Sequence, residues 1–134
     1  MGVRTIEFRG KDFAGKWRFG AYIPTEHAFW KEPSILTLAT RTAIMPETLG
    51  QFTGCLDING KQIYEGDILE SRASEDKRDW KKWVVQFSDG AFEAVKASER
   101  KRKRSPNDVT VVCKDEVTFY GFVVVGNVFD NRVG

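Results

Sequence analysis

Residues 82–96, which read KWVVQFSDGAFEAVK, decide the fold class of this chain. Apolar side chains recur at every second position from Trp83 to Phe87, and an Asp-Gly pair separates them from a second β-like run. Alternation with a period of two is typical of a strand. Asp-Gly favours a tight hairpin turn because both residues tolerate positive φ. The stretch therefore predicts a hairpin with strands at 82–88 and 91–96.

Shorter β-like runs, separated by turn signals, extend along the rest of the chain. The Asn-Gly pair at 59–60 predicts a second hairpin, and the Glu-Gly-Asp at 65–67 predicts a bulge or sharp bend after it. Further strands are expected at 16–23, 35–44, 53–58, 61–64, 109–112 and 117–129, the last bent at Gly121 or Gly126, with a short helix at 25–31. Many short strands without long helical periodicity predict a barrel or sandwich.

The composition is that of one globular domain spanning residues 1–134. Hydrophobic residues make up 41% of the chain and aromatic ones 13%, enough for a core without a disulfide or a metal. The net charge of +2 predicts no global attraction to nucleic acid or to an anionic membrane. Without a signal-peptide pattern or a membrane-length apolar run, we expect a cytoplasmic protein. Cys55 and Cys113 lack a Cys-x-x-Cys pattern, and two buried thiols are favoured over a disulfide.

Three stretches of the chain form a recognisable pattern: MPETLGQFTG at 45–54, DINGKQIYEGDI at 57–68 and VGNVFDN at 125–131. Through these stretches the chain resembles the YopX-like family of phage and prophage proteins. The family-motif residues, structural or functional, are Pro46, Glu47, Gly50, Gln51, Gly54, Asp57, Gly60, Tyr64, Glu65, Gly66, Asp67, Gly126 and Asn127. The stretch 24–43 and the basic loop 97–108 depart from the family's pattern.

What the resemblance implies is a mostly β fold with an SH3-like barrel part and a phage or mobile-element origin in a bacterial host cell. It implies no reaction. Combined with the hairpins, the expected fold class is mainly β: a small SH3-like or open β-barrel built from hairpins, with at most one or two short helices.

Carboxylates and the single histidine are the candidate catalytic groups. Glu65 and Asp67 would face the same way on a strand and could hold a metal or act as acid and base. An Asp at such a turn more often accepts hydrogen bonds from backbone amides. Asp57 opens a calcium-loop-like DING sequence, but Lys61 stands where a ligand is needed, so a hairpin turn is favoured. His27 has no zinc-ligand partners at suitable spacing. We therefore expect no catalytic residue, no metal and no cofactor.

Two groups of cations are candidate nucleic-acid contacts. One is the uninterrupted basic run of Arg100, Lys101, Arg102, Lys103 and Arg104. The other surrounds Trp80, which lies between Lys77-Arg78 and Lys81-Lys82. Five cations can neutralise several phosphates, and an exposed Trp80 could stack on a base. A solvated loop explains the basic run equally well, so both interpretations stay open.

Three functions from different classes follow. The first-ranked is a phage or prophage accessory protein, a non-catalytic β-barrel adaptor that binds a host or phage macromolecule, with a protein favoured as partner. The alternative is a nucleic-acid-binding module that uses the basic loop 100–104 and Trp80. A metal- or carboxylate-dependent enzyme using Glu65 and Asp67 ranks third. Membrane binding is not expected, and exposed strand edges are compatible with a homo-oligomer.

Overall fold

The computed structural model describes residues 6–24, 33–37, 40–97, 108–112 and 117–130. The chain divides into two compact units, Met1–Phe52 and Thr53–Gly134. Both units are built from antiparallel strands, and their helical content within the described residues is limited to short 3-10 turns. The prediction of a mainly β protein is therefore confirmed, while a single domain over 1–134 stays a prediction. No helix among the described residues is long and apolar enough to cross a membrane.

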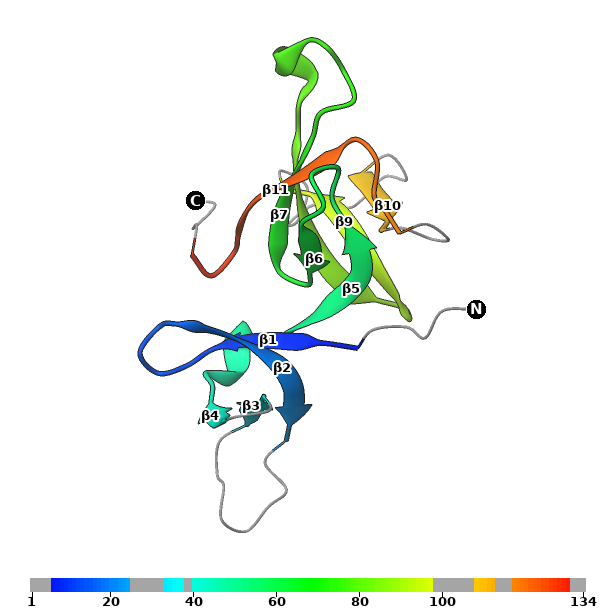
Figure 1. Cartoon of the computed structure of the whole chain (residues 1–134). Coiled ribbons are helices and arrows are strands. Elements are labelled where there is room, and N and C mark those ends of the chain that lie inside the picture. The colour runs from blue at the N-terminus through cyan, green and yellow to red at the C-terminus, as the bar shows by residue number, and fades with distance from the viewer. Residues whose placement is uncertain (1–5, 25–32, 38–39, 98–107, 113–116, 131–134) are drawn as a thin grey trace. The chain divides into compact units, whose positions relative to one another are not determined.

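The first unit is one antiparallel sheet (Figure 1). Its strands are β1 (Phe8–Lys11), β2 (Trp17–Ile23), β3 (Ser34–Leu36) and β4 (Arg41–Ala43), in the order β4-β3-β2-β1, followed by the start of β5 (Gly50–Leu56). The 3-10 turn η1 (Pro46–Thr48) leads into β5. The strand expected at 16–23 is confirmed.

The single strand expected at 35–44 was wrong. This stretch instead folds back on itself as the pair β3 and β4, with Ile35 opposite Thr42. At the turn, the Thr37 and Thr40 hydroxyl oxygens lie 3.0 Å apart, and the Thr37 N–H donates to the Thr40 carbonyl. Hydroxyl side chains offer the backbone turn-forming bonds in place of a continued ladder, which explains the break. The helix expected at 25–31 lies outside the described residues.

Close packing at Gly10 fixes the centre of the first unit. A Cβ at this position of β1 would lie 2.5 Å from the Cδ1 atom of Ile44, whose side chain is fully buried. Only a residue without a side chain allows β1 and Ile44 to approach this closely.

We expect Gly10→Ala to lower the free energy of unfolding by about 1–3 kcal/mol, because the added methyl group overpacks the site. Adding Ile44→Val, which removes the clashing Cδ1 atom, should recover part of the loss. Chemical denaturation of the wild type, both single variants and the double variant measures this coupling. Purely additive losses would contradict the contact.

The second unit contains the hairpin that the sequence predicts at 82–96. Strands β8 (Lys82–Ser88) and β9 (Ala91–Lys96) pair in antiparallel register, and the turn residues Asp89 and Gly90 have φ values of 52° and 81°. Five strands form one sheet in the order β10-β9-β8-β7-β11, with β7 at Asp67–Ser71, β10 at Val109–Val111 and β11 at Phe122–Asn127. The prediction of this hairpin is confirmed residue for residue.

The remaining strands of this unit differ in extent from those expected: β5 begins at Gly50 in place of residue 53, and β6 and β10 are each one residue shorter. After the end of β5 at Leu56, the turn at 57–61 leads into β6 (Gln62–Tyr64). The strand expected at 117–129 is reduced to β11: Gly121, with φ of 85°, lies in the turn before it, and its pairing with β7 shifts between Val124 and Gly126. Gly121 therefore precedes the strand, and the irregularity in the pairing falls on Val125, next to Gly126. No closed barrel is found among the described strands, and the SH3-like barrel stays a prediction.

A single apolar cluster forms the core of the second unit. Its buried members are Cys55, Ile63, Leu69, Trp83, Val85, Phe92, Ala94 and Val112. Cys55 is fully buried and disulfide-bonded, so the expectation of two buried thiols was wrong. The chain's other cysteine, Cys113, lies outside the described residues. Spacing along the chain could not decide this point, because bond formation depends on the distance between Cα atoms in the fold.

The buried carboxylate of Asp57 connects the β5–β6 turn to β11. Its Oδ1 atom accepts hydrogen bonds from the backbone N–H groups of Asn59 (2.8 Å) and Lys61 (2.9 Å), and its Oδ2 atom accepts from that of Val124 (2.9 Å). Asp57 is 2% exposed. The DING sequence therefore forms a hairpin turn, as favoured, and its carboxylate is occupied by amides.

We expect Asp57→Asn to lower the free energy of unfolding by about 2–3 kcal/mol. An amide nitrogen in place of one carboxylate oxygen faces a backbone N–H donor, and a buried donor left without an acceptor costs about 1–3 kcal/mol. Asp89→Asn is the matched control: this exposed turn residue has positive φ, which Asn tolerates, so the change should stay within about 0.5 kcal/mol. Equal losses in the two variants, measured by urea denaturation, would contradict the assignment.

Candidate functional site: a cationic groove beside Trp80

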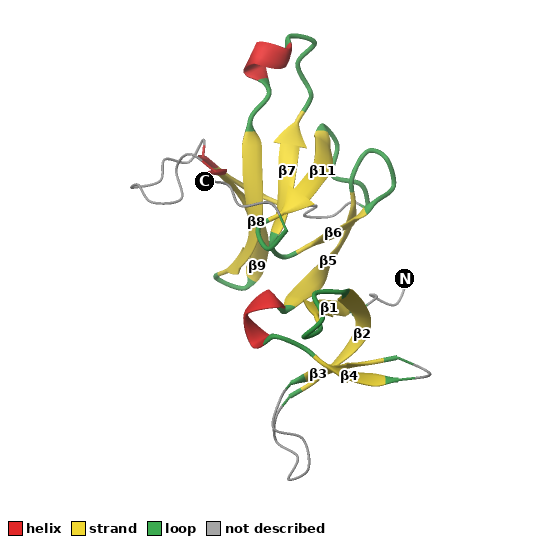
Figure 2. Cartoon of the chain, turned by 90° about the vertical axis from the view of Figure 1, so that its left-hand side faces the viewer, coloured by secondary structure: helices red, strands yellow, loops and turns green. Residues whose placement is uncertain are grey.

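A long, ordered connection joins β7 to β8, and we call residues 72–81 the β7–β8 arm. Figures 1 and 2 show it projecting beyond the ends of the two strands, with the 3-10 turn η2 (Lys77–Asp79) at its tip. At its base the Ser71 N–H donates to the Lys81 carbonyl (2.8 Å), and the Lys81 N–H donates to the Ser71 hydroxyl (3.1 Å). These bonds extend the β7–β8 ladder into the arm.

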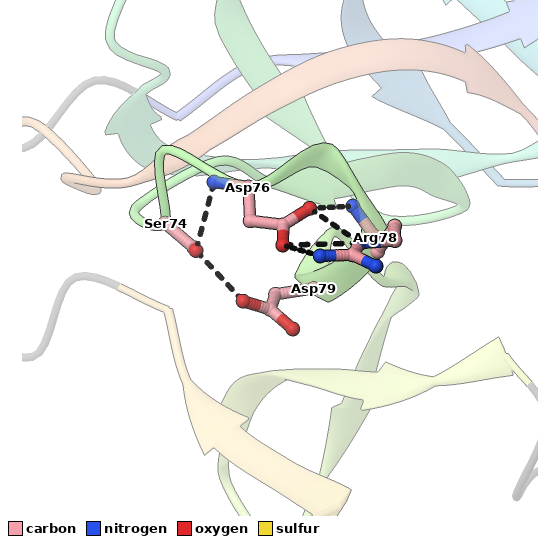
Figure 3. A network of polar contacts seen from close by, with 4 residues as sticks. All are labelled: Ser74, Asp76, Arg78 and Asp79. Atoms are coloured by element: carbon pink, nitrogen blue, oxygen red, sulfur yellow. Dashed lines mark hydrogen bonds and ion pairs between the residues drawn. The ribbon is translucent and has the colours of Figure 1, made fainter.

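Side-chain hydrogen bonds hold the tip of the arm in shape (Figure 3). Asp76 caps η2 by accepting from the Arg78 backbone N–H (2.9 Å), and its carboxylate also pairs with the Arg78 guanidinium (2.7 Å). The Ser74 hydroxyl donates to Asp79 (2.9 Å) and accepts from the Asp76 N–H (3.2 Å). The conformation of the tip is therefore fixed by hydrogen bonds within the arm as well as by packing.

Trp80 is half-buried at the end of the arm. Its indole N–H donates to the Ser74 carbonyl (2.9 Å). The Arg72 guanidinium carbon lies 4.8 Å from the ring centroid and the Lys77 ammonium 5.8 Å from it, both within range of a cation–π interaction. These three contacts hold the ring in one orientation, and the ring forms a wall at this end of the arm.

That wall borders a groove, which we call the Trp80 groove, of about 340 Å³. Its lining residues are Trp80, Lys81, Lys82, Lys96 and Ala97. The Lys96 ammonium lies 3.6 Å from the Asp108 carboxylate and 5.6 Å from the Trp83 ring. Lys81 and Lys82 are exposed, and within the described part of the chain neither has an acidic partner.

Three lysines around one aromatic wall favour an anionic ligand. An ammonium group binds phosphate as a compact point charge with three donors. Among the described residues Lys81 and Lys82 form no ion pair, although Glu70 lies opposite Lys82 in the strand register, whereas Lys96 is already partly neutralised by Asp108. The groove is therefore suited to one or two phosphate groups of a larger ligand, with apolar contact to Trp80.

The structure describes only some of the residues that the sequence suggested as site residues. Trp80 and its neighbouring lysines meet at the groove, but Arg100 to Arg104 and His27 lie outside the described residues. Lys96 was missed by sequence reasoning. A two-residue turn at 89–90 sets position 83 opposite position 96. The predicted register of the hairpin therefore already placed Lys96 opposite Trp83, near the start of β8.

The two carboxylates considered for catalysis lie at the turn between β6 and β7. Asp67 is 2% exposed, and its carboxylate accepts a hydrogen bond from the backbone N–H of Tyr64 (2.7 Å). This is the hydrogen bond to a backbone amide that was expected for an Asp at a turn. Glu65 is half-buried in the same turn, followed by Gly66 with φ of 93°. Within the described residues no three His, Cys, Asp or Glu side chains gather as they would around a metal.

Several other motif residues also have a role in backbone geometry. Gly54, inside β5, and Gly60, in the β5–β6 turn, adopt positive φ values of 86° and 82°. Asn127 accepts hydrogen bonds through Oδ1 from the N–H groups of Phe129 (3.0 Å) and Asp130 (2.9 Å). In these cases the motif specifies backbone geometry, and none of these residues lines the Trp80 groove.

Fold and groove together define a small, mainly β protein with a cationic, aromatic-walled surface. The sequence profile of the YopX protein family matches residues 6–133, nearly the whole chain, and the chain belongs to that family. Protein EF1440 from Enterococcus faecalis, known from a crystal structure, is similar in fold, with a TM-score of 0.51, 19% identity and 96% of each chain covered. Curated protein sequences contain no match.

We expect the Asp76 carboxyl to titrate below its ordinary range. The Arg78 guanidinium, followed by the Arg78 backbone N–H, lowers the pKa of Asp76. A carboxyl whose pKa is lowered in the folded state stabilises the structure above the unfolded pKa of about 3.9, and that contribution is lost as the pH falls through the folded pKa. Carbon-13 NMR titration of the side chain measures the pKa, and Arg78→Ala should move it upward. An unchanged value in that variant would contradict the assigned cause.

Proposed function

We propose that the chain is a non-catalytic accessory protein of phage or prophage origin that binds nucleic acid in the bacterial cytoplasm through the Trp80 groove. The family resemblance supports the origin and an SH3-like arrangement of strands. A cytoplasmic location requires the core around Cys55 to persist with its disulfide reduced, because cytosolic thiols are kept reduced.

The observation that carries the ligand class is the pair Lys81 and Lys82 beside the Trp80 wall. Both ammonium groups are exposed at the rim of a defined groove and are not neutralised by an acid in the described residues. Phosphate contacts of this kind release counterions and supply most of the affinity for nucleic acid. Along the chain, the basic run 100–104 begins three residues after Ala97, the last lining residue of the groove.

A protein partner was ranked first on sequence grounds, and the geometry supports it less directly. A protein-binding surface is expected to have a desolvated aromatic core. The groove instead combines one half-buried Trp with three lysines, two of which are exposed. Charge is thus the dominant property of this surface, which favours a polyanion.

We expect the protein to bind a fluorescently labelled 20-nucleotide probe with a Kd in the micromolar range or tighter at about 50 mM salt, read by fluorescence anisotropy. Log K should fall linearly with log salt concentration. The double variant Lys81→Ser, Lys82→Ser should reduce the magnitude of this slope by about 1.4–1.8, since each phosphate contact contributes about 0.7–0.9.

Lys61→Ser is the matched control, because Lys61 is an exposed lysine of the β5–β6 turn in the same unit and lies outside the groove. Its slope should equal that of the wild type. Replacing Arg100 to Arg104 with Ser measures the contribution of the basic run separately. Absence of binding, or a slope that ignores Lys81 and Lys82, would refute the proposal. A protein captured from host lysate that resists nuclease and requires these two lysines would establish a protein ligand instead.

A further inference from the structure

One cation of the Trp80 groove already has an anionic partner inside the second unit. Lys96 ends β9 and lines the groove, and its ammonium lies 3.6 Å from the Asp108 carboxylate. The Lys96 side chain is 29% exposed and that of Asp108 is 15% exposed, so salt screens this pair less than it screens fully exposed charges. Asp108 is therefore a counter-ion fixed beside the proposed binding surface.

Strand pairing brings these two side chains together. In the β9–β10 ladder Val95 lies opposite Val109. The next position along the same antiparallel register sets Lys96 opposite Asp108, and directly opposed side chains project from the same face of a sheet. Lys96 also lies opposite Trp83 of β8, and its ammonium is 5.6 Å from that ring. Lys96 is thus positioned between two strands, one of which supplies a carboxylate and the other an aromatic ring.

The contact between Lys96 and Asp108 is an ion pair without a short hydrogen bond. Charge-assisted N–H···O bonds are about 2.7–2.9 Å long. At 3.6 Å the Asp108 carboxylate attracts the ammonium by its charge but lies beyond hydrogen-bond distance. A phosphate oxygen that hydrogen-bonds to Lys96 therefore replaces a weaker interaction, at the cost of separating Asp108 from this cation.

We propose that Asp108 restrains the binding of nucleic acid at the Trp80 groove by competing with phosphate for Lys96. A phosphate that reaches Lys96 exchanges one ion pair for another, so the net gain from this lysine is small. Lys81 and Lys82, which form no ion pair among the described residues, supply the affinity instead. The inference rests on the proposed function and adds a regulation of the same site: a change that removes the charge of Asp108 makes the groove bind more tightly.

The test is a neutral variant of Asp108 with a similar side-chain shape. Asp108→Asn should bind the labelled probe about fivefold to eightfold more tightly than the wild type at about 0.1 M salt, since Lys96 then adds one phosphate contact. The same contact should increase the magnitude of the slope of log K against log salt concentration by about 0.7–0.9, so that the two curves meet at about 1 M salt.

Asp108→Ser, which keeps an oxygen as hydrogen-bond acceptor, is the second variant and should show the same gain. Urea denaturation without the probe shows whether each variant is folded.

Asp89→Asn is the matched control, because it changes the net charge by the same amount in the same unit. Asp89 is an exposed residue of the β8–β9 turn, at the other end of the hairpin from Lys96. At roughly 3.3 Å per residue it lies about 20 Å away, which exceeds the Debye length of about 10 Å at about 0.1 M salt. Its binding and salt dependence should therefore match those of the wild type.

A double-mutant cycle assigns the gain to Lys96. In the wild-type background Lys96→Ser should change the affinity less than about twofold, because Asp108 already offsets most of the charge of this lysine. In the Asp108→Asn background the same substitution should remove the whole gain. Coupling of this kind is expected for residues in direct contact.

The outcomes separate this inference from the proposed function. If the wild type binds with the expected dependence on Lys81 and Lys82, but Asp108→Asn and Asp108→Ser bind no more tightly, the restraint is refuted and the groove stands. A gain that persists after Lys96→Ser also overturns the restraint, because the gain then comes from the overall charge. If neither the wild type nor the Asp108 variants bind the probe, the proposed function and this inference both fail.

Discussion

In the second unit, the backbone N–H groups that have no partner strand at the turns must be hydrogen-bonded in another way, and the fold depends on two carboxylates that accept these bonds. Asp57 does this for three amides, two in its own turn and one in β11, which lies 67 residues further along the chain. Asp67 does it for Tyr64 at the next turn. Because a buried N–H without an acceptor costs as much as a lost hydrogen bond or more, these carboxylates determine where the chain reverses. Both acids thereby become structural groups.

Two acidic residues of the YopX motif therefore have a structural role, because they hold turns through hydrogen bonds. Asp57 and Asp67, which on sequence alone resembled a calcium ligand and a catalytic carboxylate, instead accept hydrogen bonds from backbone amides, and Gly60 and Gly66 near them adopt positive φ. The residues that we propose to bind a ligand lie elsewhere, on the β7–β8 arm and its adjoining strands. A scaffold of antiparallel hairpins can support such additions because loops and sheet faces tolerate change that turn and core positions do not.

Prediction succeeded where local physics is sufficient. The Asp-Gly turn and the period-two pattern defined β8 and β9, because a two-residue turn sets the register of the whole hairpin. The same reasoning failed at 35–44, where a continuous β-branched run concealed the turn between Thr37 and Thr40. It also failed for Cys55, since a disulfide depends on a distance between segments that no local pattern encodes.

By itself the sequence determined the mainly β class, the family, the β8–β9 hairpin and the positions of most turns, since alternation and turn chemistry act over a few residues. Only the tertiary structure decided which charged and aromatic residues meet. Trp80 is oriented by Arg72 and by a carbonyl six residues away, while Lys96 arrives from β9 to complete the groove. Asp108 reaches Lys96 because strand pairing places opposed side chains on one face. Binding surfaces of this kind are assembled from separate strands, so they arise only once the sheets have formed.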